Sequence, residues 1–208
     1  MRYRQLIMAA AVALAAVALA ACGSSNDDKS STSSSGGGAG GGDAKKIALL
    51  LPETKTTRYE AKDRPLFTAK VKAICPKCTI LYSNASQDAS KQQQQAEAAL
   101  TQGAKVMVLD PVDGAAAATI VKQANAKKVP VISYDRLLLN SKPDYYVEFN
   151  SPSVGKIQGK ALADKLGNKG TIVMINGAPT DNNAKLFKQG AHSALDAVAA
   201  MTQSEEEQ

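Results

Sequence analysis

The stretch Val129-Pro-Val-Ile-Ser-Tyr-Asp-Arg136 decides the fold of this chain. It is a short apolar run around Pro130, rich in β-branched residues, and such a run is typical of a buried strand. The strand ends at Asp135 and Arg136. In an open α/β sheet, ligands bind beyond the carboxyl ends of the strands, where a carboxylate accepts hydrogen bonds and a guanidinium donates them. The stretch therefore predicts a pair of binding residues, with a structural ion pair in a loop as the alternative.

Similar strands precede and follow this one, and they alternate with helices. We expect strands at 46–51, 79–82, 106–110 and 145–149, and helices at 60–73, from about 88 to Gly103, and at 113–127. Crossover connections of this length imply parallel strands, and continuous apolar strands are covered on both faces. The sequence thus predicts an α/β fold with a doubly wound parallel sheet.

Four of the predicted strands are followed by a polar side chain, at Glu53, Asn84, Asp110 and Asp135. Because the carboxyl ends of parallel strands meet at one edge of a sheet, we expect these side chains to form a polar rim there. For each residue taken alone, a role in a turn or a helix cap is the alternative.

After Asn150 the alternation starts again. We expect a helix at 151–166, a strand at 171–175 and a helix at 184–199. Asp181, Asn182 and Asn183 lie at the start of the last helix. One such residue is enough to cap a helix, so we expect at least one of the three to bind a ligand.

Composition and spacing argue against several classes of function. The 208 residues carry a formal net charge of +6, but the basic residues are scattered and aromatic residues are few, which argues against a nucleic-acid surface. The chain has a single histidine, His192, and shows neither a phosphate loop nor a set of metal ligands. Asp110 and Asp135 could serve a glycosidase, yet nothing marks one as acid and the other as nucleophile. We therefore expect a protein that binds without catalysis, metal or cofactor.

The first 21 residues have the pattern of a secretory signal, with Arg2 and Arg4 before an apolar run. The tetrapeptide Leu19-Ala20-Ala21-Cys22 resembles the lipobox of bacterial lipoproteins. That resemblance implies cleavage before Cys22 and lipid on its sulfur and new amino terminus, with ordinary signal cleavage as the alternative. Residues 22–44 are rich in Ser and Gly and are expected to form a flexible tether.

Two further cysteines lie close together, as Cys75-Pro-Lys-Cys78. Two thiols are too few for a metal site, and outside the cytoplasm a local disulfide is the preferred interpretation. Free thiols and redox activity are the alternatives.

Five segments of the chain match a known family in order and spacing. They are Thr57-Arg58-Tyr59, Gln102-Gly-Ala-Lys-Val106, Val131-Ile-Ser-Tyr-Asp-Arg136, Asp144-Tyr-Tyr-Val147 with Val154-Gly155, and Asn176-Gly-Ala-Pro-Thr-Asp-Asn-Asn-Ala-Lys-Leu-Phe187. Over about 45–196, the chain resembles the periplasmic sugar-binding proteins of ABC transporters of the ribose/xylose type, and within them the xylose-binding and multiple-monosaccharide-binding proteins. The resemblance implies the periplasmic binding protein type I fold, with two α/β lobes and a sugar in the cleft between them.

The same resemblance implies which residues hold the sugar. From the first lobe, Asp135 and Arg136 would bind hydroxyls and Arg58 would donate to them. Tyr59 would cover the apolar face of a pyranose, and Asn84 is a weaker candidate. The candidates from the second lobe are Asn182, Asn183 and Lys185.

Partners and domain boundaries are expected from the same resemblance. The implied function is delivery of a monosaccharide, xylose first, to the membrane subunits of an ABC importer at the extracytoplasmic face of the bacterial membrane. We expect an incomplete first lobe at 45–149, the beginning of a second lobe at 150–199 and an acidic tail at 200–208, as in a truncated product. A chemosensory or degenerate, non-transporting binding protein is the alternative. A cytoplasmic sugar-responsive repressor is disfavoured by the lipobox.

Overall fold

The computed structural model describes residues 45–206. The predicted signal segment, Cys22 and the whole Ser/Gly tether lie outside these residues. Among the described helices, none is long and apolar enough to cross a membrane.

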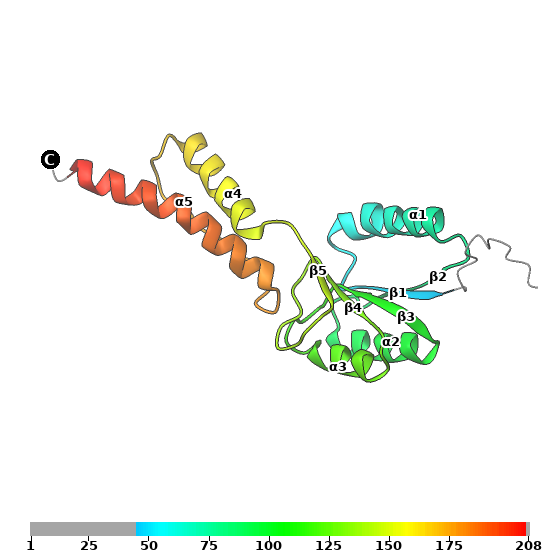
Figure 1. Ribbon diagram of the computed structural model, residues 1–208. Helices are drawn as coiled ribbons and strands as arrows, with labels where there is room; N and C mark the ends of the chain where they lie inside the picture. The colour runs from blue at the N-terminus through cyan, green and yellow to red at the C-terminus, as the bar shows by residue number, and fades with distance from the viewer. Residues whose placement is uncertain (1–44, 207–208) are drawn as a thin grey trace, which may run out of the picture. The chain divides into compact units, whose positions relative to one another are not determined.

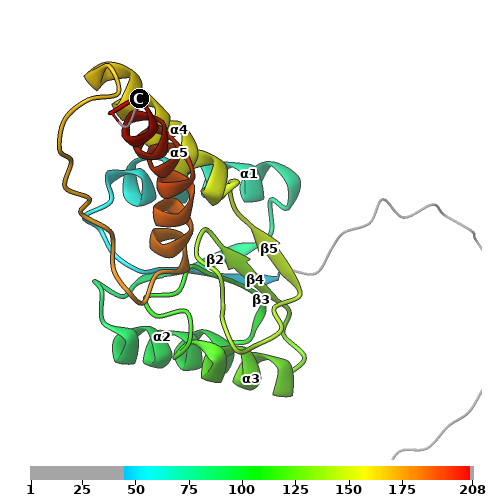
Figure 2. The same cartoon turned by 90° about the vertical axis from the view of Figure 1, so that its left-hand side faces the viewer.

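Five parallel strands form one sheet in the order β2-β1-β3-β4-β5, as a doubly wound fold requires. The strands are β1 (Lys46–Leu51), β2 (Thr79–Asn84), β3 (Ala104–Leu109), β4 (Val131–Tyr134) and β5 (Tyr145–Val147). The helices are η1 (Tyr59–Asp63), a π-helical turn, with α1 (Arg64–Ile74), α2 (Ala89–Thr101), α3 (Ala118–Ala126), α4 (Ser151–Leu166) and α5 (Asn182–Glu206). Helix α1 covers one face of the sheet, and α2 and α3 cover the other (Figures 1 and 2).

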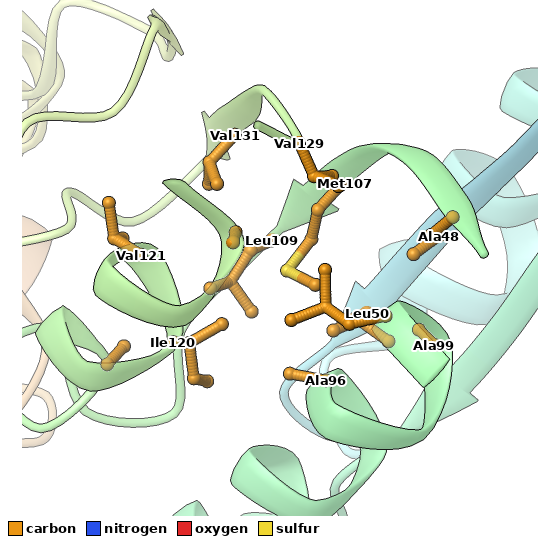
Figure 3. Packing of buried hydrophobic residues seen from close by; sticks show 14 of the residues in the cluster. Ala48, Leu50, Ala96, Ala99, Met107, Leu109, Ile120, Val121, Val129 and Val131 are labelled. Carbon is orange, nitrogen blue, oxygen red and sulfur yellow. The ribbon is translucent and has the colours of Figure 1, made fainter. Parts of the chain in front are cut away.

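The main core lies between the sheet and helices α2 and α3. Figure 3 shows Leu50, Met107 and Leu109 of β1 and β3 pointing toward Ile120 of α3, and each of these side chains is at most 2% exposed. Burial of each such side chain contributes about 1.5–3 kcal/mol, so this layer holds the strands in place. A smaller cluster, Leu49, Leu51, Tyr59 and Val108, lies on the face that α1 covers.

The predicted strand at 171–175 does not form. Residues 171–178 have no regular secondary structure, and Val173 and Ile175 are 85% and 93% exposed. A strand needs a neighbour that shares its backbone hydrogen bonds, and within the described residues no strand of the sheet pairs with this segment. Local sequence pattern could not reveal this, because β-branched residues favour a strand whether or not a partner is present.

Two helix boundaries also differ from the prediction. Helix α3 begins at Ala118, because Asp113 Oδ1 accepts hydrogen bonds from the backbone N–H groups of Ala115 and Ala116 and so closes a turn before the helix. Helix α5 begins at Asn182 and continues to Glu206, so its backbone includes most of the predicted acidic tail.

Helices α4 and α5 run in the same direction, are joined by the segment 167–181, and lie side by side in both views (Figures 1 and 2). Glycines allow the close approach. A Cβ added at Gly155 would lie 2.1 Å from the carbonyl oxygen of Phe187, and one at Gly190 would lie 2.1 Å from that of Pro152. This close packing against α4 therefore fixes the position of α5 and of the residues at its N-terminus.

Cys75 and Cys78 are joined by a disulfide at the end of α1. The bond closes a very short loop, in which Cys78 N–H also donates to the Cys75 carbonyl at 2.9 Å. Its contribution to stability through loop entropy is accordingly small.

Candidate ligand-binding site

Asp135 lies at the centre of the predicted rim, directly after β4. Its φ of +60° is in the left-handed region, which Asp tolerates better than most residues. The conformation is held on both sides, because Asp135 N–H donates to the Val147 carbonyl at 3.0 Å and Ser133 Oγ donates to the Arg136 carbonyl at 2.9 Å. Five other non-glycine residues of the described chain also have a positive φ, so it is the side-chain contacts of Asp135, rather than its backbone, that distinguish it.

Arg58 and Tyr59 reach Asp135 from the segment before α1. The Arg58 guanidinium pairs with Asp135 Oδ2, and its Nε lies 3.0 Å from Asp63 Oδ2. The Tyr59 hydroxyl donates to Asp135 Oδ2 at 2.6 Å. Burial, then the charge of Asp110, then the hydrogen bond to Asp135 raise the pKa of Tyr59, so the phenol stays protonated and remains a donor. The Asp135 carboxylate thus pairs with the Arg58 cation and accepts a hydrogen bond from the Tyr59 hydroxyl, and both residues come from the same turn.

Asn183 reaches Asp135 from the opposite side, at the start of α5. Its Nδ2 lies 3.2 Å from both the carbonyl oxygen and Oδ1 of Asp135. Asp181 Oδ1 accepts from Asn183 N–H at 2.9 Å and so caps the helix. Of the three consecutive residues, Asp181 therefore caps the helix and Asn183 is the binding candidate that reaches Asp135.

Arg136 occupies a second position beside Asp135. Its Nε lies 3.1 Å from Asp181 Oδ2 and 3.8 Å from Asp110 Oδ1. Burial opposes the charged form, but the neighbouring carboxylates of Asp181 and Asp135 help to outweigh it and raise the pKa of Arg136. We use the name Asp135 cluster for the set Arg58, Tyr59, Asp63, Asp110, Asp135, Arg136, Asp181 and Asn183.

The Asp135 cluster is rich in buried polar atoms that lack a hydrogen bond. Within residues 45–206, seven buried side-chain atoms have none, and six of them belong to this cluster. They are Arg58 Nε, Asp63 Oδ2, both carboxylate oxygens of Asp110, Arg136 Nε and Asn183 Oδ1. Arg58 Nε and Asp63 Oδ2 pair with each other as ions, and Arg136 Nε pairs with Asp181, so the atoms with the weakest pairing are those of Asp110 and Asn183. Buried polar groups in folded proteins are otherwise almost always paired, so their concentration here favours a site that takes a polar ligand.

Three predicted site residues lie apart from the Asp135 cluster. Asn84 belongs to a neighbouring network, in which its Nδ2 donates to the Glu53 carbonyl at 3.0 Å and to Glu60 Oε1 at 3.1 Å. Lys185 is exposed on α5 and Asn182 is partly buried, and the structure describes no hydrogen bond for either side chain. A ligand role for these three residues stays a prediction.

Tyr59 is at the predicted place but is not a free stacking surface. The side chain is 2% exposed and packs with Leu49, Leu51 and Val108. In this arrangement its hydroxyl, rather than its ring, faces the site. The phenol explains the difference, because a buried Tyr hydroxyl needs an acceptor and Asp135 supplies one.

Glu148 was not predicted, although it follows β5 and borders the site. Ser151 Oγ donates to its Oε1 at 3.2 Å. Burial, a shared hydrogen bond with Asp135 and repulsion from that carboxylate raise the pKa of Glu148 to about 7. Its signal in the sequence was its place at the end of the fifth strand, the same position that singled out the rim residues.

The raised pKa of Glu148 predicts a pH-dependent stability. Because the folded protein holds this proton more tightly than the unfolded chain, stability falls as pH rises from the unfolded value to about 7. Glu148→Gln should therefore gain stability relative to the unmodified protein between about pH 5 and about pH 8, by about 1 kcal/mol or less because Glu148 is partly exposed. Urea unfolding at both pH values measures the gain. A difference between the two proteins that does not change with pH would refute the shift, and Asp164→Asn, at an exposed carboxyl of α4, is the control.

A cavity of about 220 Å³ lies next to the cluster, between α4, α5 and the segment 174–177. Asp181, Ala184 and Phe187 line it, so Asp181 faces both the cavity and Arg136. Within residues 45–206, no three His, Cys, Asp or Glu side chains are placed to hold a metal ion.

Comparisons with known proteins agree with this geometry. A family model described as a periplasmic binding protein domain matches residues 47–208. The D-xylose-binding periplasmic protein of Escherichia coli (strain K12) is 31% identical over 150 residues, which are 72% of this chain and 44% of that protein. A multiple sugar-binding periplasmic receptor of Rhizobium radiobacter is 38% identical over 114 residues, which are 52% of this chain and 32% of the receptor.

Solved structures of solute-binding proteins also match this chain. An ABC transporter solute-binding protein of Clostridium phytofermentans with bound β-D-glucose matches with a TM-score of 0.68 and 29% identity, over 74% of this chain and 48% of that one. This chain thus spans less than half the length of each of these three proteins.

Proposed function

The chain belongs to the periplasmic binding protein domain family, and on that premise we propose that it binds a monosaccharide at the Asp135 cluster. The protein would act as an extracytoplasmic receptor that delivers the sugar to an ABC importer and performs no chemistry on it. The observation that carries the proposal is the convergence of Arg58, Tyr59 and Asn183 on the buried Asp135, beside the Asp110 carboxyl, which has no hydrogen bond.

The chemistry of the cluster suits a sugar. Each hydroxyl of a sugar both donates and accepts a hydrogen bond. Asp135 offers acceptors, and Arg58 and the Asn183 amide offer donors. These groups already bond to one another, so a sugar would exchange internal hydrogen bonds for bonds of similar strength. Selectivity would come from buried groups that an incorrect epimer leaves unpaired.

The two sides of the cluster come from different parts of the chain. Residues 45–149 supply Arg58, Asp135 and Arg136, whereas 150–199 supply Asp181 and Asn183. We propose that these segments belong to the two lobes of the fold, so that the sugar joins them and draws α5 toward the sheet. Among the sugars, D-xylose is our first candidate, since two of the matched proteins are named for it.

Calorimetric titration of the full chain with D-xylose, L-arabinose, D-glucose, D-galactose and D-ribose tests the proposal. We expect saturable binding of at least one sugar, with circular dichroism showing that the sample is folded. A folded sample that gives no heat with any of the five would refute the proposed function. Uptake of the bound sugar, with and without the protein, separates transport from a chemosensory role.

We also propose that Cys22 is lipidated and holds the protein at the outer face of the membrane. The proposal is supported by the tetrapeptide Leu19–Cys22 and rests on sequence alone. Labelling of cells with an alkynyl fatty acid should mark the protein, and Cys22→Ala should abolish the label. Equal labelling of both proteins would refute lipidation at this residue.

A further inference from the structure

We propose that Asp110 is a further sugar-contacting residue, which determines specificity by exchanging hydrogen bonds, as an uncharged carboxyl group, with one hydroxyl of the bound sugar. The inference rests on the proposed function of the Asp135 cluster. The inference adds Asp110 to the residues that contact the ligand. Neither the binding motifs of the sequence nor the ion pairs of the site assign it that role.

The backbone holds Asp110 in a defined position at the end of β3, in the middle of the sheet. Its N–H donates to the Leu50 carbonyl at 3.0 Å, and its carbonyl accepts from Gln92 Nε2 at 2.8 Å. Gln92 is itself 1% exposed, and its Oε1 accepts from Val112 N–H at 2.9 Å. A buried glutamine thus fixes the loop that carries Asp110, and the direction of its side chain is set before any ligand binds.

The carboxyl group of Asp110 is fully buried and has no hydrogen bond. Its exposure is 0%, and neither of its oxygens has a partner. Arg136 Nε, at 3.8 Å, is beyond hydrogen-bonding distance. The Tyr59 hydroxyl has one proton, which it donates to Asp135. Leaving a buried polar group unpaired costs about 1–3 kcal/mol, so a purely structural residue at this position would more economically be apolar.

The surroundings favour the uncharged form of Asp110. Burial and, after it, the charge of Asp135 raise the pKa of this carboxyl well above its usual range, and they outweigh Arg136 and the nearby Tyr59 hydroxyl, which lower it. A protonated carboxyl has one O–H donor and a free acceptor oxygen. A sugar hydroxyl also donates and accepts once each, so the two groups can satisfy one another completely.

A short segment, Thr180 and Asp181, is bound to the loop that follows Asp110 and would have to yield to the ligand. Thr180 holds it to the 110–114 loop, since its carbonyl accepts from Gly114 N–H at 3.2 Å and its Oγ1 donates to the Val112 carbonyl at 3.3 Å. Asp181 adds its ion pair with Arg136. These few contacts are all polar, and a polyhydroxyl ligand can replace each of them. Once Arg136 turns toward the sugar, Asp110 becomes the acceptor and donor beneath it.

A double-mutant cycle tests the inference. The probes are the tightest-binding monosaccharide of the calorimetric panel and its monodeoxy analogues, each titrated into the full chain and into Asp110→Leu. Loss of one hydroxyl should weaken binding to the unmodified protein by about 10- to 100-fold. Asp110→Leu should weaken binding of the parent sugar by a similar factor. In this variant, the analogue that lacks the hydroxyl contacted by Asp110 should bind as well as the parent sugar does.

Two controls distinguish a ligand contact from a structural role. Asp110→Asn keeps the shape, one donor group and one acceptor, so it should bind the parent sugar within about 3-fold of the unmodified protein. If Asp110→Leu does not fold, Asp110→Ala replaces it in the cycle.

The outcomes separate the proposed sugar-binding function from the role inferred for Asp110. Equal losses for every analogue in both proteins would mean that Asp110 is not coupled to any hydroxyl and would overturn the inference, as would unchanged binding to Asp110→Leu. An Asp110→Asn variant as weak as Asp110→Leu would overturn the uncharged form. Absence of sugar binding by the unmodified, folded protein would overturn the proposed function first, and the inference with it.

Discussion

Replacement of Asp135 with alanine is expected to abolish sugar binding, raising Kd by about 100-fold or more. The Asp135 carboxylate is the common acceptor for Arg58 and Tyr59. Asn183 Nδ2 donates both to Oδ1 of this carboxylate and to the backbone carbonyl of Asp135. Its removal leaves the buried Tyr59 hydroxyl without its acceptor and leaves Arg58 with Asp63 alone, which costs free energy before the sugar arrives. The donors would then lose their alignment, so the loss exceeds that of a single hydrogen bond to the sugar.

The test is calorimetric titration of Asp135→Ala with the sugar that the unmodified protein binds best. Asp164→Ala is the matched control, because Asp164 is an exposed aspartate of α4 whose ion pair is with Lys160 in the same helix. The control should bind as the unmodified protein does. Binding by Asp135→Ala within a few-fold of that value would place the sugar somewhere other than the Asp135 cluster.

The sheet and its polar edge could be predicted because their signals are local. Each buried strand is a continuous apolar run, and the crossovers between runs have the length of a helix. Parallel strands end at the same edge, so the polar residues after β1 to β4 had to lie near one another. The family resemblance then joined Asp135 to Asn183, which lies 48 residues further along and could not be placed by periodicity.

The detailed partnerships could not be predicted, because each depends on contacts distant in sequence. Nothing local distinguishes Asn84, which bonds to Glu60, from Asp135, which bonds to Arg58. Nor could the sequence show that the Tyr59 ring is buried or that Asp110 lacks a partner, since both follow from packing of several elements. The segment 171–175 failed for the same reason: a strand is a property of two segments, not of one.

Replacement of Gly155 with alanine is expected to destabilise the packing of α4 against α5 by about 3 kcal/mol. In an ordinary helix this change stabilises, by about 1 kcal/mol, because alanine has the higher helix propensity. Here the new Cβ would lie 2.1 Å from the Phe187 carbonyl oxygen and 2.8 Å from its Cα, closer than real Cβ atoms approach other backbone. The clash is with backbone rather than with a flexible side chain, so the helices must move apart.

Urea unfolding of the full chain followed by circular dichroism measures this loss, and Ala161→Gly on the exposed face of α4 is the control. The control should cost about 1 kcal/mol through helix propensity alone, so the two substitutions destabilise although they are chemically opposite. Because Asn183 lies one helical turn before Phe187, displacement of α5 should also weaken sugar binding in Gly155→Ala. A Gly155→Ala variant at least as stable as the unmodified protein would show that the helices do not pack this closely.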